Sequence, residues 1–315
     1  MRKAIRKDGC KWRFKLLICI GEILADMIGE EKNGITTYER KAGGAPFNVA
    51  CALKKFGSDV KFVGSVGDDL IGQFLIKYAH DFGMDTTYIH QNKERNTTLA
   101  FVELNEEGDR SFCFYRKNTA DYCMPTVSDE LIGKTDIVCI GSLMLADEGC
   151  VEYALDIVNR AHALGKTVAF DVNYRTDIFR DKESAVKTYK KILSVADIVK
   201  FSEDEVETFT EEYVSSLEGK LVLITLGKEG SEWRYNGKRG RVPAITVKPV
   251  DTTGAGDAFF AGALSILDNN VGKTLTDEVL NHALRFGNIA GALNTTGRGA
   301  IDNLPDLETI KTFLI

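Results

Sequence analysis

Short apolar runs alternate with longer amphipathic segments along most of this chain. Six runs rich in Val and Ile have the length and continuity of strands buried on both faces: Phe14–Ile20, Val60–Val63, Ile137–Ile140, Thr167–Phe170, Ile198–Lys200 and Leu221–Thr225. The segments between them carry apolar residues at helical spacing, over Ala45–Phe56, Leu70–Phe82, Val151–Leu164, Ser184–Leu193 and Glu203–Tyr213. Repeated strand–helix units predict an α/β fold with a mostly parallel central sheet and helices on both faces.

Two stretches interrupt this alternation. Thr98–Leu104 and Ser111–Arg116 flank the turn-rich Asn105–Asp109, which predicts a β-hairpin, and Gly34–Arg40 is short and polar. They indicate a small antiparallel layer set apart from the main sheet, either a lid over a ligand cleft or a structural excursion at the sheet edge. No flexible linker divides the chain. We therefore expect one domain over residues 14–315, with lid segments at about 30–41 and 97–117.

Composition narrows the class of protein. The 315 residues carry a net charge of −6, which argues against a nucleic-acid-binding protein. Seven cysteines show no C-x-x-C spacing, and the four histidines are far apart in the sequence, so nothing resembles a zinc site. Cysteines within apolar runs predict reduced, buried thiols in a cytoplasmic protein.

The N-terminus is basic and is followed by the apolar run Leu16–Ile20, a pattern that faintly resembles a signal peptide. This run is too short and is broken at once by Gly21 and Glu22. We therefore interpret residues 1–13 as an N-terminal extension. No stretch is long enough to span a membrane.

The segment with the strongest chemical character is Asp251–Asp257, which reads Asp-Thr-Thr-Gly-Ala-Gly-Asp and precedes a run of small apolar residues. A glycine-rich loop that opens onto a helix N-terminus is a physical anion site. Asp257 is then either an ordinary acidic residue of a first helical turn or a general base that takes a proton from a substrate hydroxyl. In the second case the amides of Gly254, Ala255 and Gly256 would hold the charge of a transferred phosphoryl group. The residues alone leave both roles open.

Two segments far apart in the chain carry a resemblance to a known family. Ala42–Ala50, with Gly57 and Gly64, resembles the first signature of the ribokinase/PfkB family of carbohydrate kinases, and Asp251–Phe259 resembles the second. The similarity extends over nearly the whole chain from Leu16, and stretches such as Gly108–Arg116 resemble the fructokinases of this family. It implies a ribokinase-like three-layer sandwich with a small β-sheet lid, and an ATP-dependent sugar kinase.

The resemblance also implies a sugar site. Asp26, at the end of the first strand, would accept hydrogen bonds from sugar hydroxyls, and Asn48 would bond the sugar through its amide. For these two residues the alternatives are an Asx turn and a polar residue of a helix start. The other substrate-binding residues implied are Gly43, Gly44, Phe114, Arg116 and Arg175. The two arginines have the alternative of ordinary surface charge.

On the nucleotide side, Ser202 and Glu205 resemble the family's Asn-x-x-Glu motif, with Ser in place of Asn. Glu205 would position Mg²⁺ through water, unless it only belongs to a solvated acidic helix face. Asp251 and Thr253 resemble the part of the loop that binds a monovalent cation, K⁺, in many members. The nucleotide-binding residues implied are Lys200, Ser202, Thr225, Gly227, Lys228, Gly254, Gly256, Asn288, Gly291 and Gly297, although close helix packing explains Gly291 equally well.

The resulting hypothesis is the transfer of a phosphoryl group from ATP to D-fructose, giving fructose 6-phosphate. A 2-keto-3-deoxygluconate kinase or another sugar kinase of the family is the first alternative, because Arg116 and Arg175 would also suit a substrate carboxylate. A non-catalytic sugar-binding protein is the second. We further expect a homodimer through the lid, because Phe101, Phe112 and Phe114 need cover, and no nucleic-acid or membrane partner.

Overall fold

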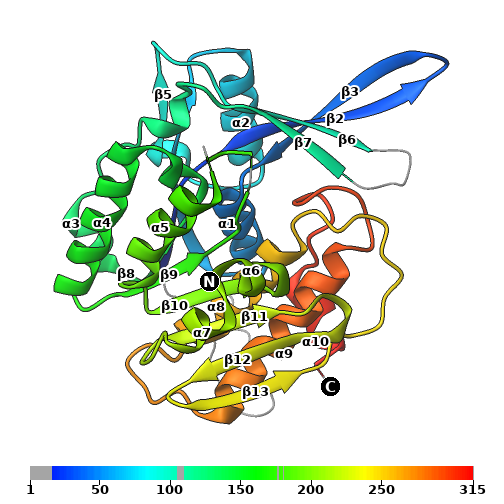
Figure 1. The fold of residues 1–315 in the computed structure, drawn as a ribbon. Coiled ribbons are helices and arrows are strands. Elements are labelled where there is room, and N and C mark those ends of the chain that lie inside the picture. Colours follow the sequence, from blue (N-terminus) through cyan, green and yellow to red (C-terminus); the bar gives the residue numbers. More distant parts are fainter. Residues whose placement is uncertain (1–15, 105–109, 176, 180, 315) are drawn as a thin grey trace.

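The chain forms two sheets of different size and character. In the computed structural model the described residues are 16–104, 110–175, 177–179 and 181–314, so the predicted extension 1–13 and residues 14 and 15 lie outside them. Within these ranges a nine-stranded sheet has the order β13-β12-β11-β10-β9-β8-β1-β4-β5, and a four-stranded sheet has the order β3-β2-β6-β7 (Figure 1). The predicted α/β class is confirmed.

The strands are β1 (Leu16–Ile20), β2 (Leu24–Lys32), β3 (Ile35–Gly43), β4 (Asp59–Gly67), β5 (Ile89–Asn92), β6 (Leu99–Leu104), β7 (Arg110–Tyr115), β8 (Thr135–Ile140), β9 (Thr167–Asp171), β10 (Ile198–Ser202), β11 (Leu221–Thr225), β12 (Ser231–Tyr235) and β13 (Lys238–Val242). The α-helices are α1 (Ala45–Lys55), α2 (Leu70–Asp81), α3 (Asp129–Lys134), α4 (Glu148–Ala163), α5 (Lys182–Leu193), α6 (Glu203–Phe209), α7 (Glu211–Ser215), α8 (Ala255–Asp268), α9 (Asp277–Asn294) and α10 (Leu307–Thr312). Short 3₁₀ turns join several of them.

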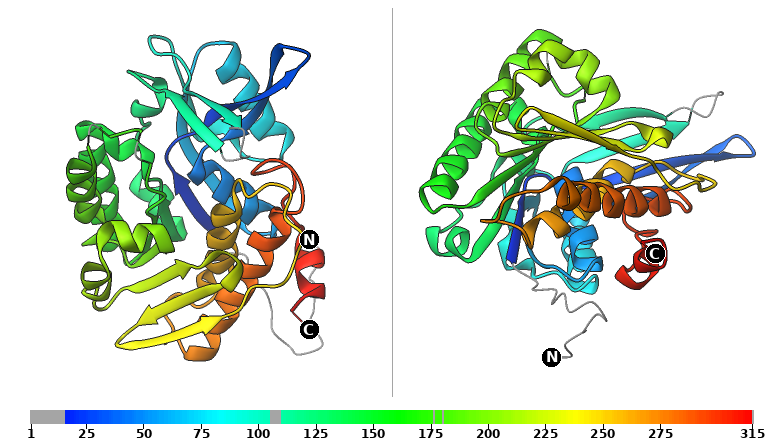
Figure 2. Two further views of the ribbon diagram at one scale, coloured as in Figure 1. Left: turned by 45° about the vertical axis from the view of Figure 1, so that its right-hand side comes forward. Right: turned by 90° about the horizontal axis from the view of Figure 1, so that it is seen from below.

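The large sheet is buried on both faces because its strands send alternate side chains to opposite sides. In β1, Leu17 and Cys19 join the core shared with α1, α2, α8, α9 and α10. Ile18 and Ile20 join the other core, shared with α3 to α7. Figure 2 shows the helices on the two sides of this sheet. β12 pairs antiparallel with both β11 and β13; the other neighbours in this sheet are parallel.

The predicted strands and helices are found, with one exception. The prediction for Leu221–Thr225 matches β11 to the residue, whereas the single helix expected over Glu203–Tyr213 is two helices, α6 and α7. They are separated at Thr210, whose φ is 73°. An α-helix cannot continue through a left-handed residue, and the Thr210 side chain instead caps α7 by accepting from the Tyr213 amide at 3.3 Å.

The four-stranded sheet projects from the body of the molecule (Figure 1) and contains the predicted hairpin, β6 with β7. The polar stretch Gly34–Arg40 forms most of β3, paired with β2. β2 itself was not expected. Asp26 is therefore the third residue of β2 and not the end of the first strand, as predicted, because β1 already ends at Ile20.

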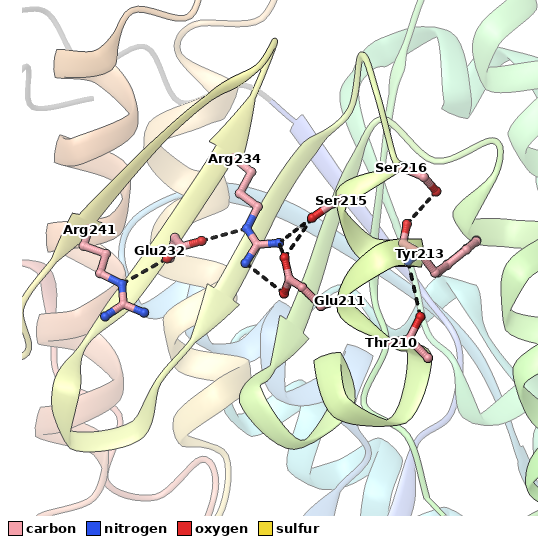
Figure 3. A network of polar contacts seen from close by, with 8 residues as sticks. All are labelled: Thr210, Glu211, Tyr213, Ser215, Ser216, Glu232, Arg234 and Arg241. Carbon is pink, nitrogen blue, oxygen red and sulfur yellow. Dashed lines mark hydrogen bonds and ion pairs between the residues drawn. The ribbon is translucent and has the colours of Figure 1, made fainter.

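A network of charged side chains joins β12 to α7 at the edge of the large sheet (Figure 3). The Glu232 carboxylate accepts from Arg234 Nε at 2.7 Å and from Arg241 Nε at 3.0 Å. Arg234 also donates to Glu211 of α7. We call Glu211, Glu232, Arg234 and Arg241 the edge network.

Six of the cysteines lie in the described part of the chain, and none of these six forms a disulfide. Cys19, Cys51, Cys139 and Cys150 are buried, as expected. Cys113 lies in β7 of the four-stranded sheet, which we call the lid, and is exposed, so the prediction of buried thiols is wrong for that residue. No described helix is both long and apolar enough to cross a membrane.

Candidate active site

The glycine-rich loop ends where α8 begins, as its sequence predicts. Gly254 is the N-cap residue and has a φ of 72°, a left-handed conformation that favours glycine. A methyl group at this position would also meet the Ala300 Cβ at 2.7 Å. Gly254 therefore lets the loop pass close to Ala300 while the first amides of α8 face outward. The Ala255 amide, expected to be an anion donor, instead lies 3.2 Å from the Thr252 carbonyl to which it donates.

Asp257, in the first turn of α8, meets a residue from the other signature segment. The Asn48 side chain donates from Nδ2 to Asp257 Oδ2 at 2.8 Å. Asn48 lies in the first turn of α1, and the start of α1 is brought to α8 because the two helices share one core. Asn48 Oδ1 is buried and has no partner within the described residues. The fold thus joins two motifs separated by about two hundred residues, and leaves one amide oxygen available beside the carboxylate.

The pKa of the Asp257 carboxyl group is shifted by its surroundings. Burial raises its pKa above the ordinary value, although the Asn48 hydrogen bond and the cations Lys200 and Arg175 lower it. Burial is the largest of these effects, so the net shift is upward. A carboxylate with a raised pKa holds an abstracted proton more firmly than a solvated one, which suits general-base catalysis.

A large cleft of about 910 Å³ opens at this point. Its floor includes Gly254, Gly256 and Asp257, and its walls include Arg175 and Lys200. The four-stranded sheet contributes its other side, through Ile28, Thr37, Glu39, Lys41 and Val102. Parallel α/β sheets bind ligands at the carboxyl ends of their strands, and this cleft lies at the ends of β9, β10 and β11.

A second cleft, of about 770 Å³, adjoins the first. It is lined by several of the residues predicted to bind nucleotide: Thr225, Gly227, Lys228, Gly256, Asn288 and Gly291. Thr225, Pro249, Thr252 and Gly256 line both clefts. Two ligands would therefore meet at the start of α8.

The predicted sugar residues near the lid come together at the first turn of α1. Gly43 lies against the Asp26 side chain, since a methyl group on Gly43 would clash with Asp26 Oδ2. Gly44 has a φ of 106° and caps α1, and a side chain there would meet the Glu22 carbonyl oxygen at 2.5 Å. Glycine at position 43 lets the backbone lie against the Asp26 carboxylate, and glycine at position 44 lets it lie against the backbone of Glu22.

Arg116 is placed differently from the expectation that it reaches substrate. Its side chain is buried, with Nε donating to Asp121 Oδ2 at 2.6 Å and Nη1 donating to the Tyr122 hydroxyl and the Leu143 carbonyl. It is not among the residues that line either cleft, whereas Arg175 is exposed and lines the larger one. Phe114 packs with Leu24, Ala100 and Leu143. Most of the Arg116 donors therefore bind the protein itself.

Glu22 is a buried carboxyl group to which the sequence analysis gave no role. Its Oε1 accepts from the Ala45 amide at 3.2 Å, at the start of the helix that carries Asn48. Burial raises its pKa to about 8. The signal that could have revealed it is a lone acidic residue directly after a buried strand, where a solvated turn would be usual.

The motif Ser202–Glu205 forms the start of α6. Ser202 and Glu205 make a reciprocal capping box, and the Glu205 carboxylate accepts from the Ser202 and Tyr174 amides at 2.7 Å each. Both carboxylate oxygens are thus occupied by backbone donors while Glu205 also lines the larger cleft. The structure gives it a capping role in addition to its place in the cleft wall.

On the nucleotide side, Asn288 donates to the Val242 carbonyl at 2.9 Å. A methyl group on Gly291 would meet the Ala255 carbonyl oxygen at 2.8 Å, so this residue both packs closely against α8 and lines the second cleft. Gly297 lies against Asn303 and lines neither cleft. The structure therefore does not place Gly297 with the other predicted nucleotide residues.

The predicted cation loop is held by Asp251. Its Oδ1 accepts from the Thr253 amide at 2.8 Å and its Oδ2 from the Gly299 amide at 2.9 Å. Thr253 Oγ1 is buried without a partner among the described residues. Nowhere in that part of the chain is there a group of three or more His, Cys, Asp or Glu side chains that could hold a metal ion by themselves.

Comparison with known proteins agrees with this arrangement. The family described as pfkB family carbohydrate kinase matches residues 15–307. The chain belongs to this family. Fructokinase-1 of Oryza sativa subsp. japonica is 34% identical over 317 residues, covering 95% of this chain and 98% of the relative.

Two solved structures are similar over nearly the whole chain. A fructokinase with bound ATP from Xylella fastidiosa has a TM-score of 0.88 and 30% identity, covering 96% of this chain and 98% of that one. A double mutant of the fructokinase of Vibrio cholerae O395, in a fructose, ADP and potassium ion bound form, has a TM-score of 0.85 and 28% identity, with coverage of 96% and 99%. This pfkB family member is an ATP-dependent carbohydrate kinase with the ribokinase-like fold.

Proposed function

We propose that this kinase phosphorylates D-fructose at its 6-hydroxyl. The observation that carries the proposal is the Asn48–Asp257 hydrogen bond, at 2.8 Å, which holds the carboxylate of a residue that lines the larger cleft. It places a base with a raised pKa beside an unpaired amide oxygen, which is what a sugar hydroxyl needs for alignment and deprotonation. The similar proteins named above are fructokinases.

The reaction follows from these residues. The sugar hydroxyl donates its proton to Asp257 as its oxygen forms a bond to the γ-phosphorus, and the bond from that phosphorus to the oxygen bridging to ADP breaks. Asn48 keeps the carboxylate oriented, and the amides of Gly254 and Gly256 at the start of α8 face the charge of the moving phosphoryl group. Closure of the lid would exclude water that could otherwise hydrolyse ATP.

Mg²⁺ in this cleft would be bound mainly by water molecules and phosphate oxygens, and not by a full set of protein ligands. Glu205 is the acidic residue placed to hold its water shell, and both of its oxygens already accept backbone N–H bonds. Mg²⁺ usually keeps several waters and is held by one or two carboxylates with substrate phosphates. When bound, it would neutralise phosphate charge.

A monovalent cation, K⁺, fits the loop around Asp251 and Thr253. The buried, unpaired Thr253 Oγ1 and the Asp251 carboxylate supply oxygen donors. Held there, the cation would fix the loop that leads into α8. Dialysis against Na⁺-free and K⁺-free buffer should lower turnover, and addition of K⁺ should restore it; unchanged turnover would remove this site from the proposal.

A neutral sugar is favoured over a sugar acid by the surroundings of Arg116. A fork-like contact from an arginine to a substrate carboxylate needs free N–H donors on two of its nitrogen atoms. Here Nε and Nη1 are engaged by Asp121, Tyr122 and Leu143, which leaves Nη2.

The test is a coupled assay of ADP formation with ATP, Mg²⁺ and a panel of fructose, glucose, ribose, 2-keto-3-deoxygluconate and fructose 6-phosphate. We expect kcat/KM for fructose to exceed the others by at least about tenfold, the value of a single well-made polar contact. A higher kcat/KM for the sugar acid would replace the proposed substrate, and no sugar-dependent turnover would refute the proposal.

We also propose a homodimer through the lid, in the cytoplasm. Tyr38, Phe101 and Tyr115 form a row of edge-to-face aromatic contacts, with ring centroids 5.1 and 5.2 Å apart. Strand alternation turns this row away from the cleft, and Tyr38 is 39% and Tyr115 61% exposed. Light scattering should give twice the chain mass, and Tyr115→Glu should give the monomer; a monomeric native protein would contradict the dimer.

Fractionation of source cells should find the enzyme with cytoplasmic markers, and recovery elsewhere would contradict the proposed cytoplasmic location.

A further inference from the structure

Two of the ten described α-helices begin without a side-chain cap from their own N-cap residue. They are α1, which begins after Gly44, and α8, which begins after Gly254. The other eight are capped by a Ser, Thr or Asp side chain: Asp69, Ser128, Asp147, Asp181, Ser202, Thr210, Thr276 and Asp306. The two exceptions are the helices that carry Asn48 and Asp257.

The start of α1 is capped from outside the helix, by Glu22. A capping residue does not fit at position 44, because Gly44 has a φ of 106° and a side chain there would meet the Glu22 carbonyl oxygen at 2.5 Å. The Ala45 amide lies ahead of the first helical hydrogen bonds and needs an acceptor. Glu22 Oε1 accepts from it at 3.2 Å. Glu22 therefore supplies the cap that the N-cap residue of α1 lacks.

This cap bears on the orientation of Asn48, which lies in the same helical turn. The Asn48 amide donates to the Gly44 carbonyl at 2.8 Å. The Asn48 side chain then donates to Asp257 Oδ2, also at 2.8 Å. A shift in the first turn of α1 would therefore move the group that orients the Asp257 carboxylate. Glu22 itself lines neither cleft, so it would act on the reaction only through α1.

Glu22 is held in the form that caps α1 without adding negative charge. It is completely buried, and Arg116, the cation that faces it, is already paired with Asp121 at 2.6 Å. Burial raises the pKa of Glu22 to about 8; Arg116 lowers it, and the Asp121 and Asp257 carboxylates raise it. Tyr189 of α5 also faces Glu22. A neutral carboxylic acid accepts a hydrogen bond through its carbonyl oxygen, and it does not repel phosphate groups.

Stability alone does not explain Glu22. Burying a polar side chain costs free energy unless its hydrogen bonds are made, and Glu22 Oε2 is buried without a partner among the described residues. We propose that Glu22 is a positioning residue for phosphoryl transfer, which fixes the first turn of α1 and thereby holds the Asn48 amide group on Asp257. This inference rests on the proposed function and adds to it a residue that touches neither substrate.

The experiment compares Glu22→Met and Glu22→Gln with the wild-type enzyme at neutral pH. Glu22→Met nearly keeps the volume and removes the acceptor, so kcat should fall and the Kd for fructose should rise, each by about tenfold, as expected for a misplaced first turn. The Kd for MgADP should stay within about twofold, because other residues line the nucleotide cleft. Glu22→Gln keeps an uncharged oxygen acceptor and should match the wild type within about twofold in all three quantities.

The matched control is Glu232→Met. Glu232 is also a buried carboxyl group, at 5% exposure, but it belongs to the edge network and lines neither cleft. This variant should lose thermal stability, because it leaves charged partners unpaired, and should keep kcat and the Kd for fructose within about twofold. It separates the loss of a buried carboxyl group from an effect on the site.

A second readout serves if Glu22→Met does not fold. As the pH rises through about 8, Glu22 in the wild type becomes a buried anion near the Asp257 carboxylate, where it would oppose the approach of phosphate. The kcat of the wild type should therefore fall from pH 7 to pH 9, and Glu22→Gln should lose this alkaline limb.

Three results would each show that Glu22 is only structural and overturn the inference. They are wild-type kcat and fructose affinity in Glu22→Met, a Glu22→Gln enzyme as impaired as Glu22→Met, and equal alkaline limbs in Glu22→Gln and the wild type. Failure of the proposed function would look different, because the wild-type enzyme would then show no fructose-dependent turnover.

Discussion

The edge network and the Lys200–Asp171 pair, in which Lys200 Nζ lies 3.0 Å from each carboxylate oxygen, are both built from charged side chains on neighbouring elements. They differ in how many N–H donors of the cation have an acceptor in the protein and in whether the cation lines a cleft. Arg234 donates to Glu232, Glu211 and Ser215, at the rim of the sheet and away from either cleft (Figure 3). Lys200 is more deeply buried, makes fewer bonds and lines a cleft. Arg234 uses four of its five N–H donors on protein atoms and lies away from the clefts, which fits a structural role, whereas Lys200 is a buried cation that has, among the described residues, a spare donor beside a cleft.

The same contrast extends to neutral groups. Asn48 Oδ1 and Thr253 Oγ1 are buried without partners among the described residues, and both belong to segments around the large cleft. Buried polar atoms are nearly always hydrogen-bonded in folded proteins. Under the proposed function we expect a substrate atom to be the partner of Asn48 Oδ1 and a cation to be the partner of Thr253 Oγ1.

The largest expected effect is that of Asp257→Asn, which keeps the shape of the side chain and removes the base. We expect kcat to fall by about 10²–10⁴-fold, the usual contribution of general-base catalysis, while fructose binding measured by calorimetry changes only severalfold. Glu232→Gln in the edge network is the matched control and should leave kcat unchanged. Near-wild-type turnover of Asp257→Asn would remove Asp257 from the mechanism.

Asn48→Ala should have the next largest effect. Its loss removes a hydrogen bond to a charged group, so kcat should fall about 10–100-fold. The same bond lowers the pKa of Asp257, and the base must be deprotonated to act. The acid limb of the kcat–pH profile should therefore move to higher pH in the variant, and an unmoved limb would show that Asn48 does not act through Asp257.

The variant Glu22→Gln tests the pH dependence of the free energy of unfolding and not the rate of the reaction. The pKa of Glu22 is about 8 in the folded protein, against an ordinary value of 4.5. Between these two pH values the folded state holds a proton that the unfolded state has released, so the free energy of unfolding falls as pH rises, by up to about 1.4 kcal/mol per pH unit. Urea unfolding from pH 5 to pH 8 should show this loss in the wild type and a flatter dependence in Glu22→Gln. Parallel curves would mean that Glu22 ionises normally.

The smallest effect should come from Arg234→Ala. Its side chain is 22% exposed and its partner Glu211 56% exposed, so each pair should contribute less than about 1 kcal/mol to the free energy of unfolding. Added salt should reduce that contribution further. Turnover should not change. A fall in kcat would show that Arg234 affects catalysis and would contradict a purely structural role for the edge network.

Much of the fold could be predicted from the sequence because the strands of the large sheet are continuous apolar runs. β11 was predicted to the residue, and the hairpin of β6 and β7 was found from its turn. β2 was missed, since Gly29 and several charged residues hide its pairing with β3. The break at Thr210 depends on one left-handed residue that has no strong sequence signal.

The site was predictable as two motifs but not as contacts. Nothing local in the sequence links Asn48 to Asp257, and Arg116 was expected to face substrate because its partner Asp121 could not be foreseen. The charged residues that end or interrupt apolar strands, Asp171 and Lys200, were a usable signal: a charge within a buried strand must be paired or functional.

The most direct test of the account is the ³¹P NMR spectrum of wild-type enzyme incubated with ATP, Mg²⁺ and fructose. Asp257, which lines the larger cleft and accepts from Asn48, predicts ADP and a sugar phosphate whose phosphorus couples to the protons on C6 of fructose. ADP with inorganic phosphate, or a spectrum in which ATP is unchanged, would contradict it.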